Sequence, residues 1–234
     1  MVTTIMLRAV VFDLFHTLTG LESEWAEVPF TSDFLGIDRR VWDKVLHTQS
    51  RWRLAGEEKD PFRILRRLVD TVDAGISDES VQAAVKVREH RYREALARIP
   101  LENIETLKRL KERGLRLGLI SNADASEVMT WQDCQLCGLF DAEVFSCDAG
   151  CVKPDLEIFD KCLERLRVGA DESLFVGDGG SDELVAARIA GFRTVFISGI
   201  IEELWPHRVA ERIAIADHHI KRLPEVEAVV ALYS

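Results

Sequence analysis

The fold of this chain is decided by the stretch R-A-V-V-F-D-L-F-H-T-L, residues 8–18. Four consecutive apolar residues, 9–12, end at Asp13. No amphipathic period runs through them, and such a short apolar run is typical of a strand buried on both faces of a parallel sheet. Asp13 would then stand at the carboxyl end of the strand, where open α/β sheets bind ligands. This segment alone is explained equally well by an Asp that merely caps the end of a strand and has no functional role.

The composition describes an ordinary globular protein, with 47% hydrophobic and 30% charged residues in a chain of 234. This length can bury one sizeable core and a small extra domain. The formal net charge of −10 argues against nucleic acid or an anionic membrane as a partner. No apolar run approaches the roughly 20 residues that span a bilayer, and the N-terminus lacks a signal-peptide pattern. We therefore expect a cytoplasmic protein, and the sequence does not indicate its oligomeric state.

The five cysteines form an odd set, which is typical of a reducing compartment. Four of them form a C-x2-C…C-x3-C series that could hold zinc: Cys134, Cys137, Cys147 and Cys151. The stretch between them resembles a helix end, a turn and a buried strand, which would spread the thiols apart. Ordinary buried thiols are therefore favoured over a structural zinc site.

The segment after the first strand predicts an all-helical insert. Residues 20–37 carry few periodic cues, and amphipathic helices are expected at 38–54, 61–74 and 77–96. Several arginines in this segment could contact a phosphate or a carboxylate, although most are expected on solvated helix faces: Arg39, Arg40, Arg51, Arg53, Arg66 and Arg67.

From Pro100 onward, strands and helices alternate. Buried strands are expected at 116–121, 143–146, 174–178, 193–198 and 213–220, with a final helix at 224–232. Alternation with short connections predicts right-handed crossovers and a doubly wound, Rossmann-like parallel sheet. The expected organisation is an α/β core of residues 1–19 and 98–234 that carries a helical domain of residues 20–97.

Polar side chains follow the strands and could meet along one edge of the sheet. In chain order they are Asp13, Ser121, Lys153, and Asp178 with Asp182. Together they resemble the four motifs of the haloacid dehalogenase (HAD) superfamily, in order and spacing, across nearly the whole chain. The helical insert looks like the cap domain of one large subgroup, which closes over the active site and chooses the substrate.

The resemblance implies a role for each motif residue. Asp13 would be the nucleophile that attacks phosphorus, and Thr17 would support it. Lys153 would hold Asp13 and a phosphate oxygen together. Ser121 and the backbone N–H of Asn122 would donate to phosphate oxygens at a helix N-terminus, where the dipole favours anions.

The stretch G-D-G-G-S-D, residues 177–182, is the acidic end of the expected site. Carboxylates at i and i+4, Asp178 and Asp182, suit a hard, oxygen-ligated Mg²⁺. Without a cation, Asp13 would face them unneutralised. The alternative gives Asp182 an electrostatic role at a helix N-terminus and Asp178 a turn role. In the resembling family, Mg²⁺ is held by the nucleophile, by the backbone carbonyl two residues on (here Phe15), and by this acidic pair.

The chain departs from the phosphatase pattern at Phe15, where the family's phosphatases have a second Asp as general acid and base. We expect the neighbouring His16 to shape the loop rather than to move a proton. Haloacid dehalogenases carry an aromatic residue at this place. They need no metal, however, and this chain has Asp43 where their cap arginine would fall.

The sequence therefore predicts a Mg²⁺-dependent phosphatase that acts on a small phosphorylated metabolite through an aspartyl-phosphate on Asp13. One alternative is a 2-haloacid dehalogenase-like hydrolase that works without metal. The other is a non-catalytic binding protein of the same fold, which the loss of Asp at position 15 favours. Retention of the four motif residues Asp13, Lys153, Asp178 and Asp182 argues against it, because idle carboxylates packed together cost stability.

Overall fold

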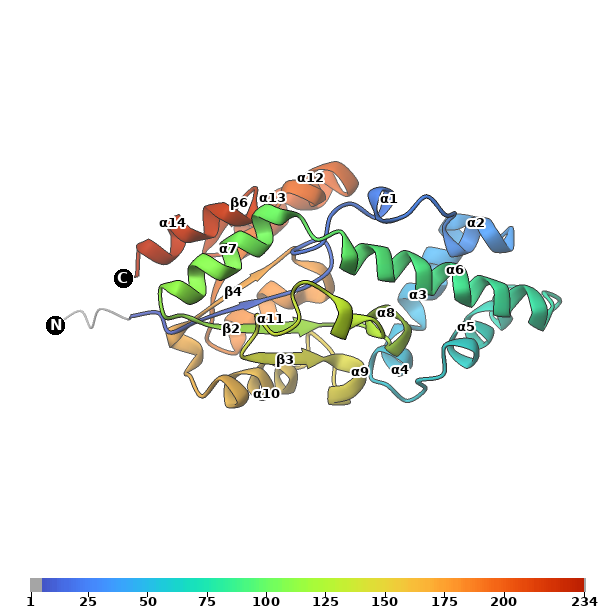
Figure 1. The fold of residues 1–234 in the computed structure, drawn as a ribbon, viewed down its shortest axis with the longest axis horizontal. Coiled ribbons are helices and arrows are strands. Elements are labelled where there is room, and N and C mark those ends of the chain that lie inside the picture. The colour runs from blue at the N-terminus through green and yellow to red at the C-terminus, as the bar shows by residue number, and fades with distance from the viewer. Residues whose placement is uncertain (1–5, 234) are drawn as a thin grey trace.

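The computed structural model describes residues 6–233. Its centre is a sheet of six parallel strands in the order β3-β2-β1-β4-β5-β6 (Figure 1). The strands are β1 (Ala9–Phe12), β2 (Arg116–Ser121), β3 (Ala142–Phe145), β4 (Ser173–Gly177), β5 (Arg193–Ile197) and β6 (His218–Ile220). β1 is fully buried and pairs on both sides, with Phe12 in register with Leu119 of β2 and with Val176 of β4. The predicted doubly wound α/β core is confirmed.

Helices cover both faces of the sheet, and the side chains of β1 alternate between two apolar clusters as a strand requires. Val10 and Phe12 join the cluster that includes residues of α7 (Leu101–Glu112) and α14 (Val226–Ala231). Ala9 and Val11 join the opposite cluster, which includes residues of α10 (Leu156–Leu166) and α11 (Glu183–Ile189). Shorter helices in the core are α8 (Ala125–Val128), α9 (Ser146–Ala149), α12 (Gly199–Leu204) and α13 (Val209–Ile215).

The segment between β1 and β2 is helical, as predicted, and most of it projects from one end of the sheet as a cap (Figure 1). Its helices are α1 (Glu22–Trp25), α2 (Thr31–Leu35), α3 (Arg39–Thr48), α4 (Ser50–Leu54), α5 (Pro61–Asp70) and α6 (Asp78–Ala97). A third apolar cluster, formed by residues between Leu35 and Val85, gives the cap a core of its own. The exact boundaries at residues 20 and 97 stay a prediction.

Two predicted elements were wrong in extent. The expected helix 38–54 is two helices, because Gln49 leaves helical geometry at φ −105° and ψ 24°. The expected strand 213–220 begins late, since α13 extends to Ile215 and only His218–Ile220 pairs with β5. Ala210, Glu211 and Arg212 are strong helix formers and favour the helix there. No helix of the described residues combines the length and the apolar character needed to cross a membrane.

Candidate active site

Asp13 lies at the carboxyl end of β1, and both of its carboxylate oxygens are held. Its backbone N–H continues the sheet by donating to the carbonyl of Val176 over 2.9 Å. The Thr17 hydroxyl donates to Asp13 Oδ2 over 2.9 Å, and Lys153 Nζ donates to Asp13 Oδ1 over 2.5 Å. A hydroxyl and an ammonium from different parts of the chain therefore fix the orientation of this carboxylate.

The ammonium of Lys153 is buried at the point where three elements meet. Besides Asp13, it donates to Glu183 Oε2 over 2.6 Å and to the carbonyl of Ile120 over 3.1 Å. Burial alone would lower the pKa of Lys153, but the charges of Asp13 and Glu183 outweigh burial and raise it above its usual value. Lys153 is therefore a permanent positive charge beside Asp13.

The backbone of Lys153 is held by the side chain of Asn122, which follows β2. Asn122 Oδ1 accepts the Lys153 N–H over 2.8 Å, and Asn122 Nδ2 donates to the Lys153 carbonyl over 2.9 Å. The sequence indicated only a backbone role for Asn122. Its side chain adds a link between the loop after β2 and the lysine.

Ser121 ends β2 with a fully buried hydroxyl. Among the described residues, this oxygen has no hydrogen-bond partner. Buried polar side-chain atoms are nearly always paired, so an unpaired one calls for an explanation. The free hydroxyl is consistent with the expected role of Ser121 as a donor to a substrate oxygen.

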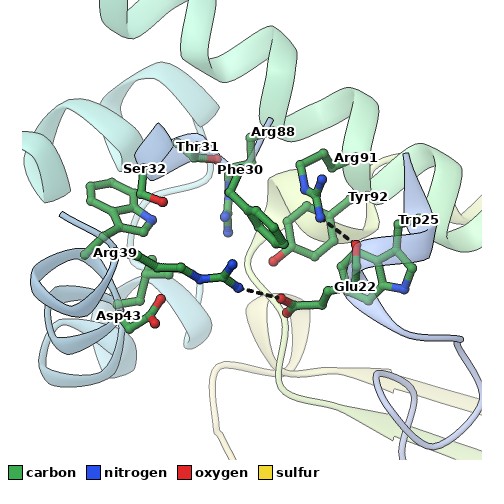
Figure 2. A pocket seen from close by; sticks show the side chains of 12 residues that line it. Glu22, Trp25, Phe30, Thr31, Ser32, Arg39, Asp43, Arg88, Arg91 and Tyr92 are labelled. Atoms are coloured by element: carbon green, nitrogen blue, oxygen red, sulfur yellow. Dashed lines mark hydrogen bonds and ion pairs between the residues drawn. The ribbon is translucent and has the colours of Figure 1, made fainter. Parts of the chain in front are cut away.

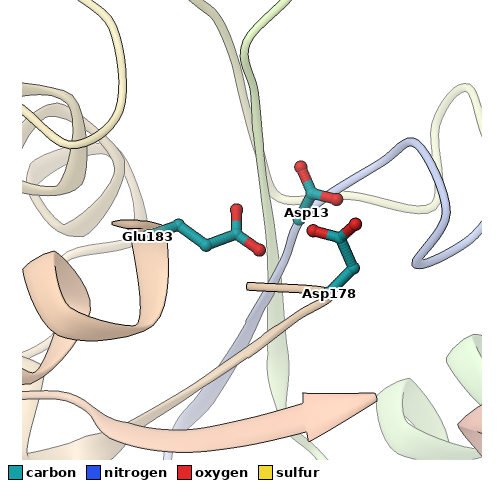
Figure 3. A group of neighbouring side chains, drawn as sticks. All are labelled: Asp13, Asp178 and Glu183. Atoms are coloured by element: carbon teal, nitrogen blue, oxygen red, sulfur yellow. The ribbon is translucent and has the colours of Figure 1, made fainter. Parts of the chain in front are cut away.

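Three buried carboxylates form the acidic end of the site: those of Asp13, Asp178 and Glu183 (Figure 3). One oxygen from each lies within 4.8 Å of the others. Asp13 and Asp178 come from the ends of the adjacent strands β1 and β4, and Glu183 reaches in from the start of α11. This is the one such group of potential metal ligands found in the described part of the chain, and the four cysteines of the C-x2-C…C-x3-C series are not in it.

The third carboxylate differs from the sequence prediction. Asp182 is exposed and lies outside the group, and the neighbouring Glu183 supplies the carboxylate instead. The reason is local: Ser181 and Asp182 both adopt left-handed geometry at φ 52°, so α11 begins only at Glu183. A Cβ at Gly177 would lie 2.2 Å from Glu183 Oε1, so this glycine makes room for Glu183.

The pKa values of two acids of the group are raised by burial and by their neighbours. Burial raises the pKa of Asp13, Lys153 opposes that effect, and the nearby Asp178 adds to it. Burial likewise raises the pKa of Glu183, to about 8, despite its contact with Lys153. Lys153 thus contacts two of the three carboxylates, and the third, Asp178, lies 3.7 Å from His16 Nδ1. Clustered carboxylate oxygens are also the donor set that Mg²⁺ prefers, so the residues present fit a divalent cation.

A family model of haloacid dehalogenase-like hydrolases matches residues 7–191. The chain belongs to this family. Among curated proteins, it is similar to the glyceraldehyde 3-phosphate phosphatases of Methanothermobacter thermautotrophicus and Methanocaldococcus jannaschii. Identities are 25% and 28%, over 85% and 82% of this chain and 88% and 85% of theirs.

Solved structures give the same family. A 2-haloacid dehalogenase from Pseudomonas syringae is 25% identical, with a TM-score of 0.63, covering 98% of this chain and 100% of that one. A HAD phosphatase from Thermococcus onnurineus shares the fold at 23% identity and a TM-score of 0.61, covering 96% and 98%. The predicted superfamily is confirmed, and the protein is a HAD-like hydrolase with a helical cap.

In this HAD-like hydrolase, Phe15 is part of an aromatic cluster at the base of the cap. Its ring centroid lies 5.8 Å from that of Trp25 and 5.5 Å from that of Tyr92. The ring has no group that can give or take a proton. Trp25 and Tyr92 of the cap therefore pack around an apolar ring at position 15, where the family's phosphatases have a second Asp.

His16 adopts left-handed geometry at φ 62°, and its ring lies between two carboxylates. Nδ1 lies 3.7 Å from Asp178 Oδ2, and Nε2 lies 3.7 Å from Glu22 Oε1. Burial would lower the pKa of His16, but the two carboxylates raise it to about 9. The sequence indicated a role in loop shape, and the structure adds an ionic link between the loop after β1 and the cap.

A second buried ionic cluster, here called the cap–core network, joins the cap to the loop after β2. Arg53 of α4 and Arg88 of α6 donate to Asp124 Oδ2 over 2.8 and 3.0 Å. Arg88 also donates to Glu127 Oε1 over 2.5 Å, and the Tyr92 hydroxyl donates to the same oxygen over 3.1 Å. Asp124 and Glu127 form the capping box at the start of α8. The sequence did not indicate these pairings: Arg53 is one of six arginines, most of which were expected on solvated helix faces.

A cleft of about 630 Å³ opens between the cap and the core beside these groups. Lys153, Asn122 and His16 line it on the core side, and Leu46 and Arg53 line it on the cap side. Asp182 lies at this cleft rather than in the carboxylate group. The cleft therefore reaches Lys153, whose ammonium contacts Asp13.

Proposed function

We propose that this HAD-like hydrolase is a Mg²⁺-dependent phosphatase that acts on a small phosphorylated metabolite. The observation that carries the proposal is the buried ionic group in which Lys153 touches both Asp13 and Glu183 while Asp178 lies nearby. A carboxylate nucleophile, a fixed cation and an acidic metal site are the parts that phosphoryl transfer to an aspartate needs. The similarity to glyceraldehyde 3-phosphate phosphatases supports a phosphorylated substrate.

In the proposed reaction, an oxygen of Asp13 bonds to phosphorus while the bond to the leaving oxygen breaks. Thr17 and Lys153 hold the carboxylate in line, and the charge of Lys153 favours the approach of an anionic phosphate. The free Ser121 hydroxyl and the backbone N–H of Asn122 donate to phosphate oxygens. Water then releases phosphate from the aspartyl-phosphate and restores Asp13.

Asp13, Asp178 and Glu183, with the backbone carbonyl of Phe15, would hold the metal. A bound Mg²⁺ supplies positive charge that polarises the phosphoryl group. The expected ligand Asp182 is replaced by Glu183 in this proposal. Because both oxygens of Glu183 already accept hydrogen bonds, from Lys153 and from the Gly179 N–H, Glu183 would act through an intervening water.

A metal-free dehalogenase is the second candidate, and the aromatic residue at position 15 is the observation that favours it. The three buried carboxylates argue against it, because one oxygen from each converges within 4.8 Å, a donor set that suits a divalent cation and that a metal-free reaction does not need. A cytoplasmic location, and partners limited to small molecules without nucleic acid or membrane, stay predictions from the sequence.

A substrate screen separates these candidates. Acyl phosphates, phosphate monoesters and 2-haloacids are each incubated with Mg²⁺ and with a chelator, and phosphate and halide are measured. Phosphate release that needs Mg²⁺ supports the proposal. Halide release that survives chelation would establish the dehalogenase instead. Absence of turnover on every substrate would favour the binding protein.

A further inference from the structure

A second pocket, here called the cap pocket, lies within the cap, between α1, α2, α3 and α6 (Figure 2). Its volume is about 90 Å³, roughly that of three water molecules in the liquid. Aromatic rings form much of its wall: Trp25, Phe30, Trp42 and Tyr92. Leu46 lines both the cap pocket and the active-site cleft, so the two spaces are neighbours.

Three polar side-chain groups that line the cap pocket form no hydrogen bond within the described residues, and none of them is a fully buried atom. They are the hydroxyls of Thr31 and Ser32 and the indole N–H of Trp42, on residues that are 7%, 1% and 3% exposed. Figure 2 shows Thr31 and Ser32 next to each other on one side of the pocket. Because these groups open to the pocket and are unpaired, they are available to a polar ligand bound there.

The charged side chains of the cap pocket balance one another. Arg39 lies 3.8 Å from Glu22 and stacks on the ring of Phe30, and Asp43 is a second acid on the same wall (Figure 2). Arg91 donates to the carbonyls of Val28 and Glu22. Within the lining, two arginines therefore face two carboxylates, while the charge of the third arginine, Arg88, is met by the cap–core network. His16, outside the lining, lies 3.7 Å from Glu22, and its charge is met on its other side by Asp178 at the same distance.

This balance selects the kind of ligand. The hydroxyls, the indole N–H and Arg39 can donate hydrogen bonds, and the hydroxyls, Glu22 and Asp43 can accept them. A ligand group that both donates and accepts hydrogen bonds, such as a hydroxyl, can pair with both the donors and the acceptors of the pocket. A carboxylate or a second phosphate would instead lie close to Glu22 and Asp43, with no excess positive charge to offset the repulsion.

We propose that the cap pocket binds a neutral, hydroxylated group of a few carbon atoms, carried on the leaving-group side of the phosphate ester. This inference rests on the proposed function, because it places the phosphoryl end of the same substrate at Asp13. The aromatic walls would contact the C–H faces of such a group, and Thr31, Ser32 and Trp42 would bind its hydroxyls. The substrate class is therefore a phosphorylated polyol or hydroxyaldehyde.

The test compares two esters that share the phosphoryl end and differ only at the far end. Glycerol 3-phosphate carries a hydroxymethyl group where 3-phosphoglycerate carries a carboxylate. Both leave as primary alkoxides, so leaving-group chemistry cancels in the ratio of their kcat/KM values. We expect a ratio of at least about tenfold in favour of glycerol 3-phosphate, because the carboxylate would lie beside two acids.

Thr31→Val and Ser32→Ala each remove one hydroxyl and change little else. Each should lower the ratio about three- to tenfold, the range expected for one lost hydrogen bond. Thr48→Ala is the matched control: Thr48 lies on α3, is exposed, and donates its hydroxyl to the Lys44 carbonyl of its own helix. The ratio in this variant should equal that of the parent.

Calorimetric binding of the same two esters to Asp13→Asn protein gives a second readout that needs no turnover. Tighter binding of glycerol 3-phosphate that weakens in the added Ser32→Ala variant supports the inference. A preference for 3-phosphoglycerate, or a ratio that responds to Ser32→Ala no more than to Thr48→Ala, overturns it. Failure of the parent to hydrolyse acetyl phosphate with Mg²⁺ overturns the proposed function alone, since the binding measurement still decides the ligand of the cap pocket.

Discussion

Asp13 and Glu183 share one ammonium group, that of Lys153, at 2.5 and 2.6 Å. The first carboxylate ends the central strand, and the second begins a helix 170 positions later in the chain. A buried lysine between two carboxylates fixes both of them, and removing either partner leaves an uncompensated charge. The geometry thus makes Glu183 part of the same unit as the proposed nucleophile.

The first prediction compares Glu183→Gln with its neighbour Asp182→Asn. Glu183→Gln should raise the Mg²⁺ concentration needed for half-maximal activity by about 10- to 100-fold, the usual cost of losing an outer-shell metal contact. Asp182→Asn should shift it by less than about threefold, because an exposed carboxylate contributes little. Initial rates measured across a Mg²⁺ titration decide the matter. A larger effect of Asp182→Asn would restore the assignment made from the sequence.

The second prediction concerns Phe15. Without an acid at this position the leaving oxygen departs unprotonated, and the missing assistance is worth about 10²–10⁴ in rate. Rates on a series of phosphate esters should therefore depend steeply on the pKa of the leaving group. Acetyl phosphate should give a burst of about one equivalent of acetate before slow turnover. Linear hydrolysis of alkyl phosphates, without a burst, would mean that another residue supplies the proton.

Variants at position 15 sharpen this test. Phe15→Asp should shorten the life of the aspartyl-phosphate, since a carboxylate there can activate water. Phe15→Leu removes the ring without adding an acid, and so controls for lost packing against Trp25 and Tyr92. Both lifetimes are measured by quenching and counting protein-bound phosphate. Equal lifetimes in the two variants would show that position 15 does not limit dephosphorylation.

The third prediction tests the cap–core network through acid stability. Asp124 faces Arg53, Arg88 and Glu127; burial would raise its pKa, but the arginines lower it below the usual value. A carboxyl with a depressed folded pKa stabilises the protein above its unfolded pKa, and this contribution is lost as pH falls through the folded value. Asp124→Asn should therefore cost about 3–5 kcal/mol at neutral pH, as for a broken buried pair.

Below about pH 4, near the unfolded pKa of an aspartate, the difference between Asp124→Asn and the parent should shrink. Denaturant unfolding at several pH values measures it. Asp148→Asn is the control, because Asp148 forms an exposed pair with Lys59 and should cost less than about 1 kcal/mol. A cost for Asp124→Asn that is small, or that stays constant down to low pH, contradicts the role given to the network.

Much of the fold could be predicted because its signals are local. The apolar run that ends at Asp13 marks a doubly buried strand, and strands that alternate with helices leave few arrangements of the sheet. The positions of Asp13, Ser121 and Asp178 at strand ends follow from the same pattern, whereas Lys153 lies in the loop after α9. Local signals failed at residues 213–216, where the alternating sequence I-A-I-A predicted a strand. The structure places these residues at the end of α13 and just beyond it.

The parts that could not be predicted depend on geometry between distant residues or on rare backbone states. Glu183 reaches the site only because Ser181 and Asp182 both take a left-handed conformation that favours glycine, and neither residue type signals it. Arg53 is buried in a pair with Asp124, which lies 71 positions further along the chain. A single sequence indicates that an arginine lies on a helix, but not which carboxylate will meet it.

The most direct test of the central claim, covalent catalysis by Asp13, is mass spectrometry of protein quenched during turnover of acetyl phosphate with Mg²⁺. The account predicts one phosphoryl group on the peptide that contains Asp13. It also predicts that Asp13→Asn, which hardly changes side-chain volume, carries no label and turns over at less than about one hundredth of the parent rate. Label on another residue, or an Asp13→Asn variant above that rate, would contradict the account.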